Sequence, residues 1–162
     1  MPDRTLLTLF DEVRRKTLWL LDTTPAIARW TPPGTANSIL WHAGHALCVV
    51  EQLTAAALLH ETEPPAALPP GWWRLFSWES RPAETRPDAW PAVEEVAAAL
   101  REQHVRLRKT FEKLTEDDLA AAVYLPVWWS EPRPARWILI HALHDEANHG
   151  GEMWLLRKLA PP

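Results

Sequence analysis

Histidine and acidic side chains gather in two short stretches of this sequence. Residues 41–45 read WHAGH, and residues 141–152 read HALHDEANHGGE. Five of the seven histidines fall in these two stretches. Neutral imidazoles and carboxylates are ligands that Zn²⁺, Ni²⁺ and Fe²⁺ accept. The two stretches together therefore suggest a site for a divalent transition metal.

Helical geometry places three of these side chains on faces that turn toward the core. A helix advances about 100° per residue, so Asp145 lies about 40° from His149, on the stripe that also carries Ile138 and Leu156. His45 lies near the middle of a mostly apolar face. A buried carboxylate is costly unless it is paired or bound to a metal. Either Asp145 accepts a hydrogen bond from one of the two histidines, or the three side chains form an open metal site.

Three further residues lie at the margins of these faces. His42 lies about 60° around the helix from His45. His141 and Glu152 fall at the edge of the stripe that carries Asp145. We predict these three as alternate metal ligands or as partners of the ligands, with His141 taking the place of Asp145 if the shorter side chain fails to reach.

Segments with helical periodicity must position these residues. Asn37 and Asp88 are candidate N-caps for two of them, and Thr115 with Asp118 resembles a capping box. No segment is a convincing strand, and only residues 123–125 have an extended pattern. The sequence therefore predicts an all-α fold, most simply one antiparallel four-helix bundle domain over residues 1–162. The predicted helices span residues 4–22, 38–61, 91–114 and 135–159.

A long connection rich in Trp and Pro separates the second and third predicted helices. It runs from about Thr62 to Trp90, whereas bundle connections usually take two to eight residues. Its large apolar side chains must pack on something. They either cap one end of the core or cover the open side of the metal site as a lid. In the second case Trp73 and Trp78 line a substrate pocket.

Two more residues are candidates for that pocket. His104 lies on the apolar stripe of the third predicted helix, where it either lines the pocket or bonds a neighbouring carbonyl as a core histidine. Cys48 follows His45 by one turn. It is either a soft ligand or nucleophile or a small buried hydrophobe. The sequence assigns no catalytic residue.

Composition excludes several classes of function. The chain has 17 basic and 21 acidic side chains and a net charge of −4, without the basic run of a nucleic-acid-binding protein. No apolar run approaches the roughly 18 residues of a membrane span. Five glycines occur, none in a phosphate-binding pattern. The single cysteine and the absence of a signal-peptide pattern predict a reducing, cytoplasmic location.

Both histidine stretches resemble the DinB/YfiT-like superfamily, over nearly the whole chain. The resemblance implies a four-helix bundle in up-down-down-up order, often dimeric, with its long connection between the second and third helices. The family's metal ligands correspond here to His45, Asp145 and His149. Most members have His where Asp145 stands. An acidic residue there resembles the mycothiol-dependent maleylpyruvate isomerase branch, which has Glu.

The resemblance implies a metal-dependent enzyme. Characterised members include transferases and isomerases in which a metal activates a low-molecular-weight thiol, which then attacks a small electrophilic substrate. The alternatives are a non-catalytic metal-binding protein related to stress and a metal-dependent hydrolase. An open coordination position would distinguish an enzyme from a structural site. We predict a two-fold homodimer, because family members are often dimeric and because Trp19 and Trp154 are predicted near helix ends.

Overall fold

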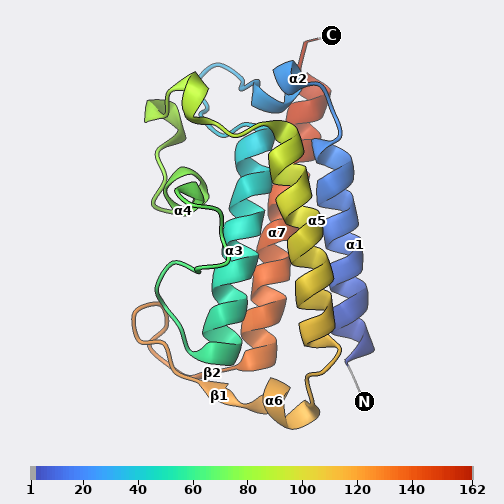
Figure 1. Cartoon of the computed structure of the whole chain (residues 1–162), viewed down its shortest axis with the longest axis vertical. Coiled ribbons are helices and arrows are strands. Elements are labelled where there is room, and N and C mark those ends of the chain that lie inside the picture. The colour runs from blue at the N-terminus through green and yellow to red at the C-terminus, as the bar shows by residue number, and fades with distance from the viewer. Residues whose placement is uncertain (1–2, 162) are drawn as a thin grey trace.

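The long helices of the protein lie side by side along its length (Figure 1). The computed structural model describes residues 3–161. In Figure 1 α1 and α7 run from bottom to top, and α3 and α5 run from top to bottom. In chain order the elements are α1 (Arg4–Leu21), α2 (Pro25–Arg29), α3 (Ile39–Leu59), α4 (Trp72–Phe76), η1 (Pro82–Glu84), η2 (Pro87–Ala89), α5 (Val93–Phe111), α6 (Glu116–Ala120), β1 (Ala122–Val123), β2 (Arg133–Pro134) and α7 (Ala135–Leu159).

Packing between the long helices creates two groups of buried apolar side chains. The most extensive contact is between α3 and α7, and α1 packs against both α7 and α5. One group contains Phe10 and Phe111, and the other contains Leu20, Leu100 and Phe76. The all-α prediction is thereby confirmed, and the α3–α7 contact brings the two histidine stretches together.

The predicted helices agree with the structure except near some of their ends. The last one spans residues 135–159 as predicted, and α3 begins one residue later than predicted. The N-cap of α3 is Ser38, whose hydroxyl accepts from the Trp41 N–H, and not Asn37. Thr115 and Asp118 form the predicted capping box at the start of α6.

The start of α5 differs from the prediction. The helix begins at Val93, and Asp88 lies in the short helix η2 and does not cap it. The Glu95 carboxylate instead caps the helix, because it accepts a hydrogen bond from the Ala92 N–H at 2.7 Å. An acidic side chain in the first turn also faces the positive end of the helix dipole.

A small antiparallel ladder lies where the sequence indicated no convincing strand. Ala122 pairs with Pro134, and Val123 pairs with Arg133. Two residues per strand are too few to produce an alternating pattern. The ladder closes the loop that leads into α7.

The long connection covers one side of α3, where α4 packs against it (Figure 1). Phe76, the last residue of α4, is fully buried. None of the helices within residues 3–161 is long and apolar enough to cross a membrane. The connection thus places part of its apolar surface beside the histidine stretch of α3.

Candidate metal centre

Three side chains from α3 and α7 meet where these helices pack together. Oδ2 of Asp145 lies 3.8 Å from Nε2 of His45 and 3.6 Å from Nε2 of His149. One ligand atom from each of the three lies within 4.8 Å of the others. The structure therefore brings together the three residues that the sequence predicted as metal ligands.

The long connection fixes the orientation of His45. Nδ1 of His45 donates to the backbone carbonyl of Phe76 at 2.6 Å, so Nε2 carries the lone pair and faces Asp145. The Trp41 ring stacks on the imidazole with centroids 4.6 Å apart, and its Nε1 donates to the Ser80 hydroxyl. Burial lowers the pKa of His45 from its ordinary value, although the Phe76 carbonyl partly opposes this. His45 is therefore held neutral with one nitrogen free.

Gly44 allows this contact to form. A Cβ at this position would lie 2.3 Å from the Phe76 ring, far inside ordinary contact distance. The absence of a side chain at Gly44 lets the ring pack on the α3 backbone, and this docking brings the Phe76 carbonyl to His45. The isolated glycine in the helical pattern thus has a packing reason.

His149 is oriented from its other side by Glu152 and His42. Its Nδ1 lies 2.8 Å from Oε2 of Glu152 and 2.8 Å from Nδ1 of His42. In the tautomer of the neutral ring that donates from Nδ1 to this carboxylate, Nε2 of His149 presents its lone pair to Asp145. A carboxylate on the outer nitrogen of a ligating histidine is a common partner in metal sites. Burial lowers the pKa of His42 to about 3, so this ring is neutral as well.

The donor set fits a divalent transition metal. Oδ2 of Asp145 is buried without a hydrogen-bond partner, although it faces two imidazole nitrogens. With both rings oriented as described, three lone pairs face one another with no proton between them. Zinc–nitrogen and zinc–oxygen bonds of about 2.0–2.2 Å place tetrahedral ligand atoms roughly 3.3–3.6 Å apart, close to the observed spacing. A cation resolves the repulsion that the three lone pairs create.

Two other predicted residues, His141 and Cys48, lie in different surroundings. His141 is exposed and stacks on Trp137 with ring centroids 5.0 Å apart, so it is not brought to the ligand group. Cys48 is fully buried with its thiol facing the Trp72 carbonyl. Burial raises the pKa of the Cys48 thiol to about 12, which favours the small-hydrophobe interpretation.

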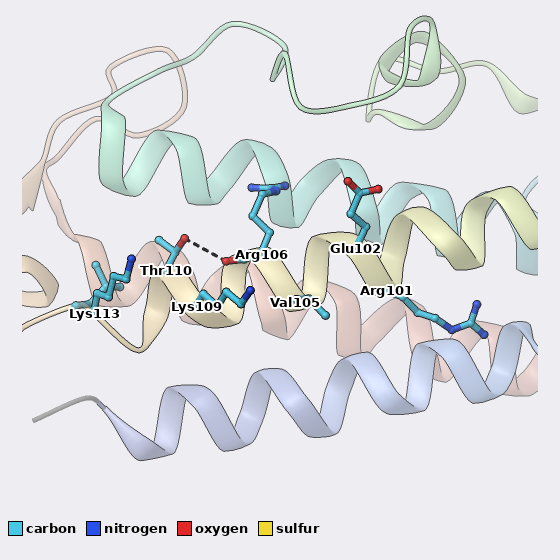
Figure 2. Close-up of a pocket in the computed structure, with 8 residues that line it drawn as sticks. Arg101, Glu102, Val105, Arg106, Lys109, Thr110 and Lys113 are labelled. Atoms are coloured by element: carbon cyan, nitrogen blue, oxygen red, sulfur yellow. Dashed lines mark hydrogen bonds between the residues drawn. The ribbon is translucent and has the colours of Figure 1, made fainter.

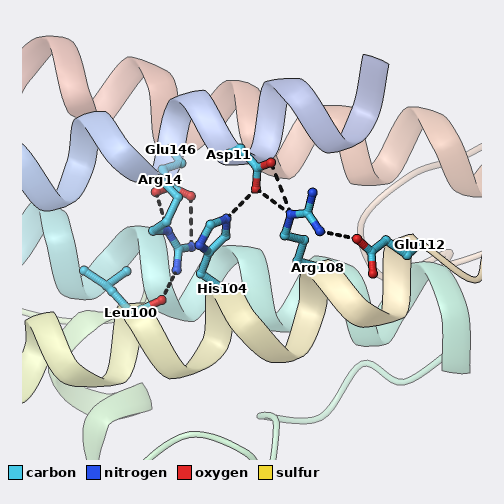
Figure 3. A network of polar contacts seen from close by, with 7 residues as sticks. All are labelled: Asp11, Arg14, Leu100, His104, Arg108, Glu112 and Glu146. Atoms are coloured by element: carbon cyan, nitrogen blue, oxygen red, sulfur yellow. Dashed lines mark hydrogen bonds and ion pairs between the residues drawn. The ribbon is translucent and has the colours of Figure 1, made fainter. Parts of the chain in front are cut away.

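His104 lies between α5 and α1, where it contacts α1 side chains. Its Nε2 donates to Oδ1 of Asp11 at 2.8 Å (Figure 3). Its ring also meets the Phe10 ring edge-on. The structure therefore does not bring His104 to the ligand group, and its hydrogen-bond partner is a carboxylate and not a backbone carbonyl.

Trp73 and Trp78 pack on each other with ring centroids 4.8 Å apart. Trp78 also meets Trp128, from the loop between β1 and β2, at 5.9 Å. Trp73 is half-buried and Trp78 is exposed. The connection contacts His45 through the carbonyl of Phe76, one of the large apolar residues of the predicted lid, and contacts Trp41 through Ser80, which the sequence did not single out.

A buried ion pair beside the site escaped the sequence analysis. Arg14 of α1 donates to both carboxylate oxygens of Glu146 at 2.8 and 3.0 Å, and both side chains are fully buried (Figure 3). Arg14 also donates to the Leu100 carbonyl and to the side-chain oxygen of Gln103. Glu146 directly follows Asp145, so this network anchors α7 at the height of the candidate ligands.

A further cavity lies elsewhere, along α5. It measures about 900 Å³ and is lined by residues of α5 and the turn that follows, including Arg101, Val105, Arg106 and Lys109 (Figure 2). Val105 is exposed and the other three are charged. This hollow is separate from the residues on α3 and α7.

The comparisons with known proteins agree with this arrangement. A sequence model of the DinB superfamily matches residues 9–153, which include both histidine stretches. A solved structure of a conserved protein from Enterococcus faecalis aligns with a TM-score of 0.69 and 18% identity, over 98% of this chain and 97% of that one. At this identity the likeness shows the fold alone. No curated protein matches the chain. The chain belongs to the DinB superfamily.

Proposed function

We propose that the protein is a metal-dependent enzyme in which His45, Asp145 and His149 hold one divalent transition ion. The observation that carries this proposal is the buried Oδ2 of Asp145, which has no hydrogen-bond partner and faces Nε2 of His45 and Nε2 of His149 at 3.8 and 3.6 Å. A structural hydrogen-bonded cluster would place a proton between these atoms at a shorter distance. Membership of the DinB superfamily supports the same assignment.

The chemistry of such an enzyme is the activation of a small thiol. A bound divalent ion lowers the pKa of a coordinated thiol and thereby stabilises the thiolate. The chain's own residues orient the ligands. The backbone carbonyl of Phe76 accepts a hydrogen bond from Nδ1 of His45, which keeps the proton on that nitrogen, and the Trp41 ring stacks on the imidazole. Asp145 is partly exposed, which leaves a route for a small molecule to the ligand group.

The resemblance to thiol-using members supports a transferase or isomerase acting on a small electrophile. Asp145 supports it further, because an acidic ligand at this position resembles the mycothiol-dependent maleylpyruvate isomerase branch. One methylene shorter than Glu, Asp145 still reaches both imidazoles at similar distances.

Metal analysis tests the ligand assignment. The protein, purified without chelators, should retain about one tightly bound transition metal per chain after desalting. His45→Ala should lose it, whereas His144→Ala should keep it, because His144 is an exposed histidine of the same helix as two of the ligands. A wild-type protein free of metal that takes up neither Zn²⁺ nor Ni²⁺ would refute the assignment.

A cobalt-substituted protein tests the use of a thiol. Glutathione should produce the intense near-ultraviolet band of a thiolate bound to Co²⁺, and S-methylglutathione should not. The His45→Ala variant should show no band with either compound. Retained cobalt without a band would exclude thiol activation and favour a hydrolase or a non-catalytic metal-binding protein.

We also propose the family's up-down-down-up topology and a homodimer for this chain. Trp19 and Trp154 support the dimer, because both are exposed and they pack on each other with ring centroids 5.2 Å apart. Light scattering at tens of micromolar should give the mass of a dimer. A monomer mass would remove this part of the proposal. The substrate pocket and the lid formed by Trp73 and Trp78 stay predictions.

A further inference from the structure

A second group of possible ligands lies on the outer side of His149. It consists of His42, His149 and Glu152, and one ligand atom from each lies within 4.8 Å of the others. The three atoms that converge are Nδ1 of each histidine and Oε2 of the carboxylate. They are separated by 2.8, 2.8 and 3.1 Å. This triangle uses the nitrogen of His149 that points away from Asp145.

Hydrogen bonds alone leave one side of this triangle unsatisfied. When Nδ1 of His149 donates to Glu152, Nδ1 of His42 either carries a proton or a lone pair. With a proton, it meets the N–H of His149 at 2.8 Å. With a lone pair, it meets the carboxylate oxygen at 3.1 Å. Each tautomer of His42 thus creates one repulsive contact within the triangle.

We propose that His42, His149 and Glu152 form a second cation site, joined to the first through the imidazole ring of His149. This inference goes beyond the proposed function, which requires only the first site. Two imidazole nitrogens and a carboxylate suit a divalent transition ion such as Zn²⁺, Ni²⁺ or Cu²⁺. A cation in place of the Nδ1 proton of His149 satisfies all three short contacts together.

The site is open to solvent from a cavity. This cavity measures about 460 Å³, and its lining includes His42 and Glu152 beside the apolar side chains of Leu155, Leu156 and Leu159. The Glu152 side chain is 57% exposed, so an ion can reach it without a rearrangement of the core. The cavity thus reaches two of the three proposed ligands, His42 and Glu152.

The second ion binds more weakly than the first and releases a proton. Nδ1 of His149 must lose its proton to the solvent before it can donate electron density to a cation. The negative charge of the resulting imidazolate, together with that of Glu152, offsets the repulsion between two divalent ions. A stepwise uptake, with one tight and one weak equivalent, is the signature of this arrangement.

Zn²⁺ titration of the metal-stripped protein, followed by native mass spectrometry and calorimetry, tests the proposal. Wild type should bind two equivalents, and the second should release a proton, detected as an enthalpy that changes with the buffer. Glu152→Gln should weaken the second equivalent at least tenfold more than the first, which loses only the partner that orients His149. The matched control, Glu94→Gln, removes an exposed carboxylate of α5 and should bind two equivalents.

Two results would overturn the second site. One is a wild-type protein that saturates at one equivalent, and the other is a Glu152→Gln variant that binds two as wild type does. Both leave the first site and the proposed function intact. The His45→Ala variant separates the two proposals, because it should lose the tight equivalent and keep the weak one.

Discussion

Replacing Gly44 with alanine tests whether the long connection controls the metal centre. The new Cβ would lie 2.3 Å from the Phe76 ring, and 3.4 Å is the lower limit of ordinary contact. The ring must therefore move by about 1 Å, and the carbonyl of the same residue moves with it, because a packed interior transmits strain. The 2.6 Å hydrogen bond to Nδ1 of His45 is then lengthened or lost.

Two free-energy terms decide the stability of this variant. Overpacking in a core costs about 1–3 kcal/mol. Alanine inside a helix regains about 1 kcal/mol relative to glycine. We therefore expect Gly44→Ala to lower the free energy of unfolding by roughly 0–2 kcal/mol, which leaves the protein folded. Its affinity for Zn²⁺ should fall about 10–100-fold, the usual effect of removing a hydrogen-bond partner from a ligating histidine.

Gly151→Ala is the matched control. Gly151 also lies within a long helix, and a Cβ there would meet nothing within 4 Å. This variant should gain up to about 1 kcal/mol from helix propensity and bind Zn²⁺ as wild type does. Competition with a chromophoric chelator measures the affinities, and urea unfolding of the metal-free proteins measures the stabilities. If Gly44→Ala binds Zn²⁺ with wild-type affinity, the Phe76 carbonyl does not control His45 and the reasoning is refuted.

Three further predictions concern buried side chains. Arg14→Met leaves the Glu146 carboxylate buried without a counter-charge and should cost about 3–5 kcal/mol in urea unfolding; Arg15→Met, at an exposed position of α1, should cost little, and equal losses would contradict the prediction. The pKa of His42 is about 3 in the folded protein against 6.5 ordinarily, so the metal-free protein should lose stability as the pH falls from 6.5 toward 3. His42→Gln should flatten that dependence, and an unchanged slope would count against it. Cys48, with a pKa of about 12, should resist iodoacetamide at about pH 8 until urea unfolds the chain, and rapid labelling of the native protein would contradict its burial.

The sequence predicted the long helices well because their periodicity extends over many turns. Residues 135–159 were predicted without error, since proline residues precede and follow that segment. The predicted start of α5 was wrong because the N–H of Ala92 donates to the side chain of Glu95, which lies three residues later in the sequence. A capping residue before the helix does not make this bond. The sequence did not predict the ladder between β1 and β2, because pairing between residues ten or more positions apart leaves no local sequence pattern.

The side chains of the candidate site were easier to predict than their supports. A four-residue spacing on one helix face and an imidazole on an apolar face were enough to single out His45, Asp145 and His149. The hydrogen bond from His45 ends on a backbone carbonyl, and a carbonyl has no signature in a sequence. Gly44 was the available signal, because an isolated glycine in a helix often marks a close approach by another segment.

Asp145 and Glu146 show how neighbouring residues divide between structure and chemistry. They differ by about 100° around α7, so they face different helices. Glu146 turns toward α1 and pairs with Arg14, and this pair is fully buried. Asp145 turns toward α3, and among residues 3–161 its ion-pair partners are the two histidines alone. One carboxylate thus has a permanent counter-charge supplied by Arg14, whereas the other lies between two imidazole rings. Since the arginine beside these two residues pairs with Glu146, the charge of Asp145 remains available for the ion that the proposed function requires.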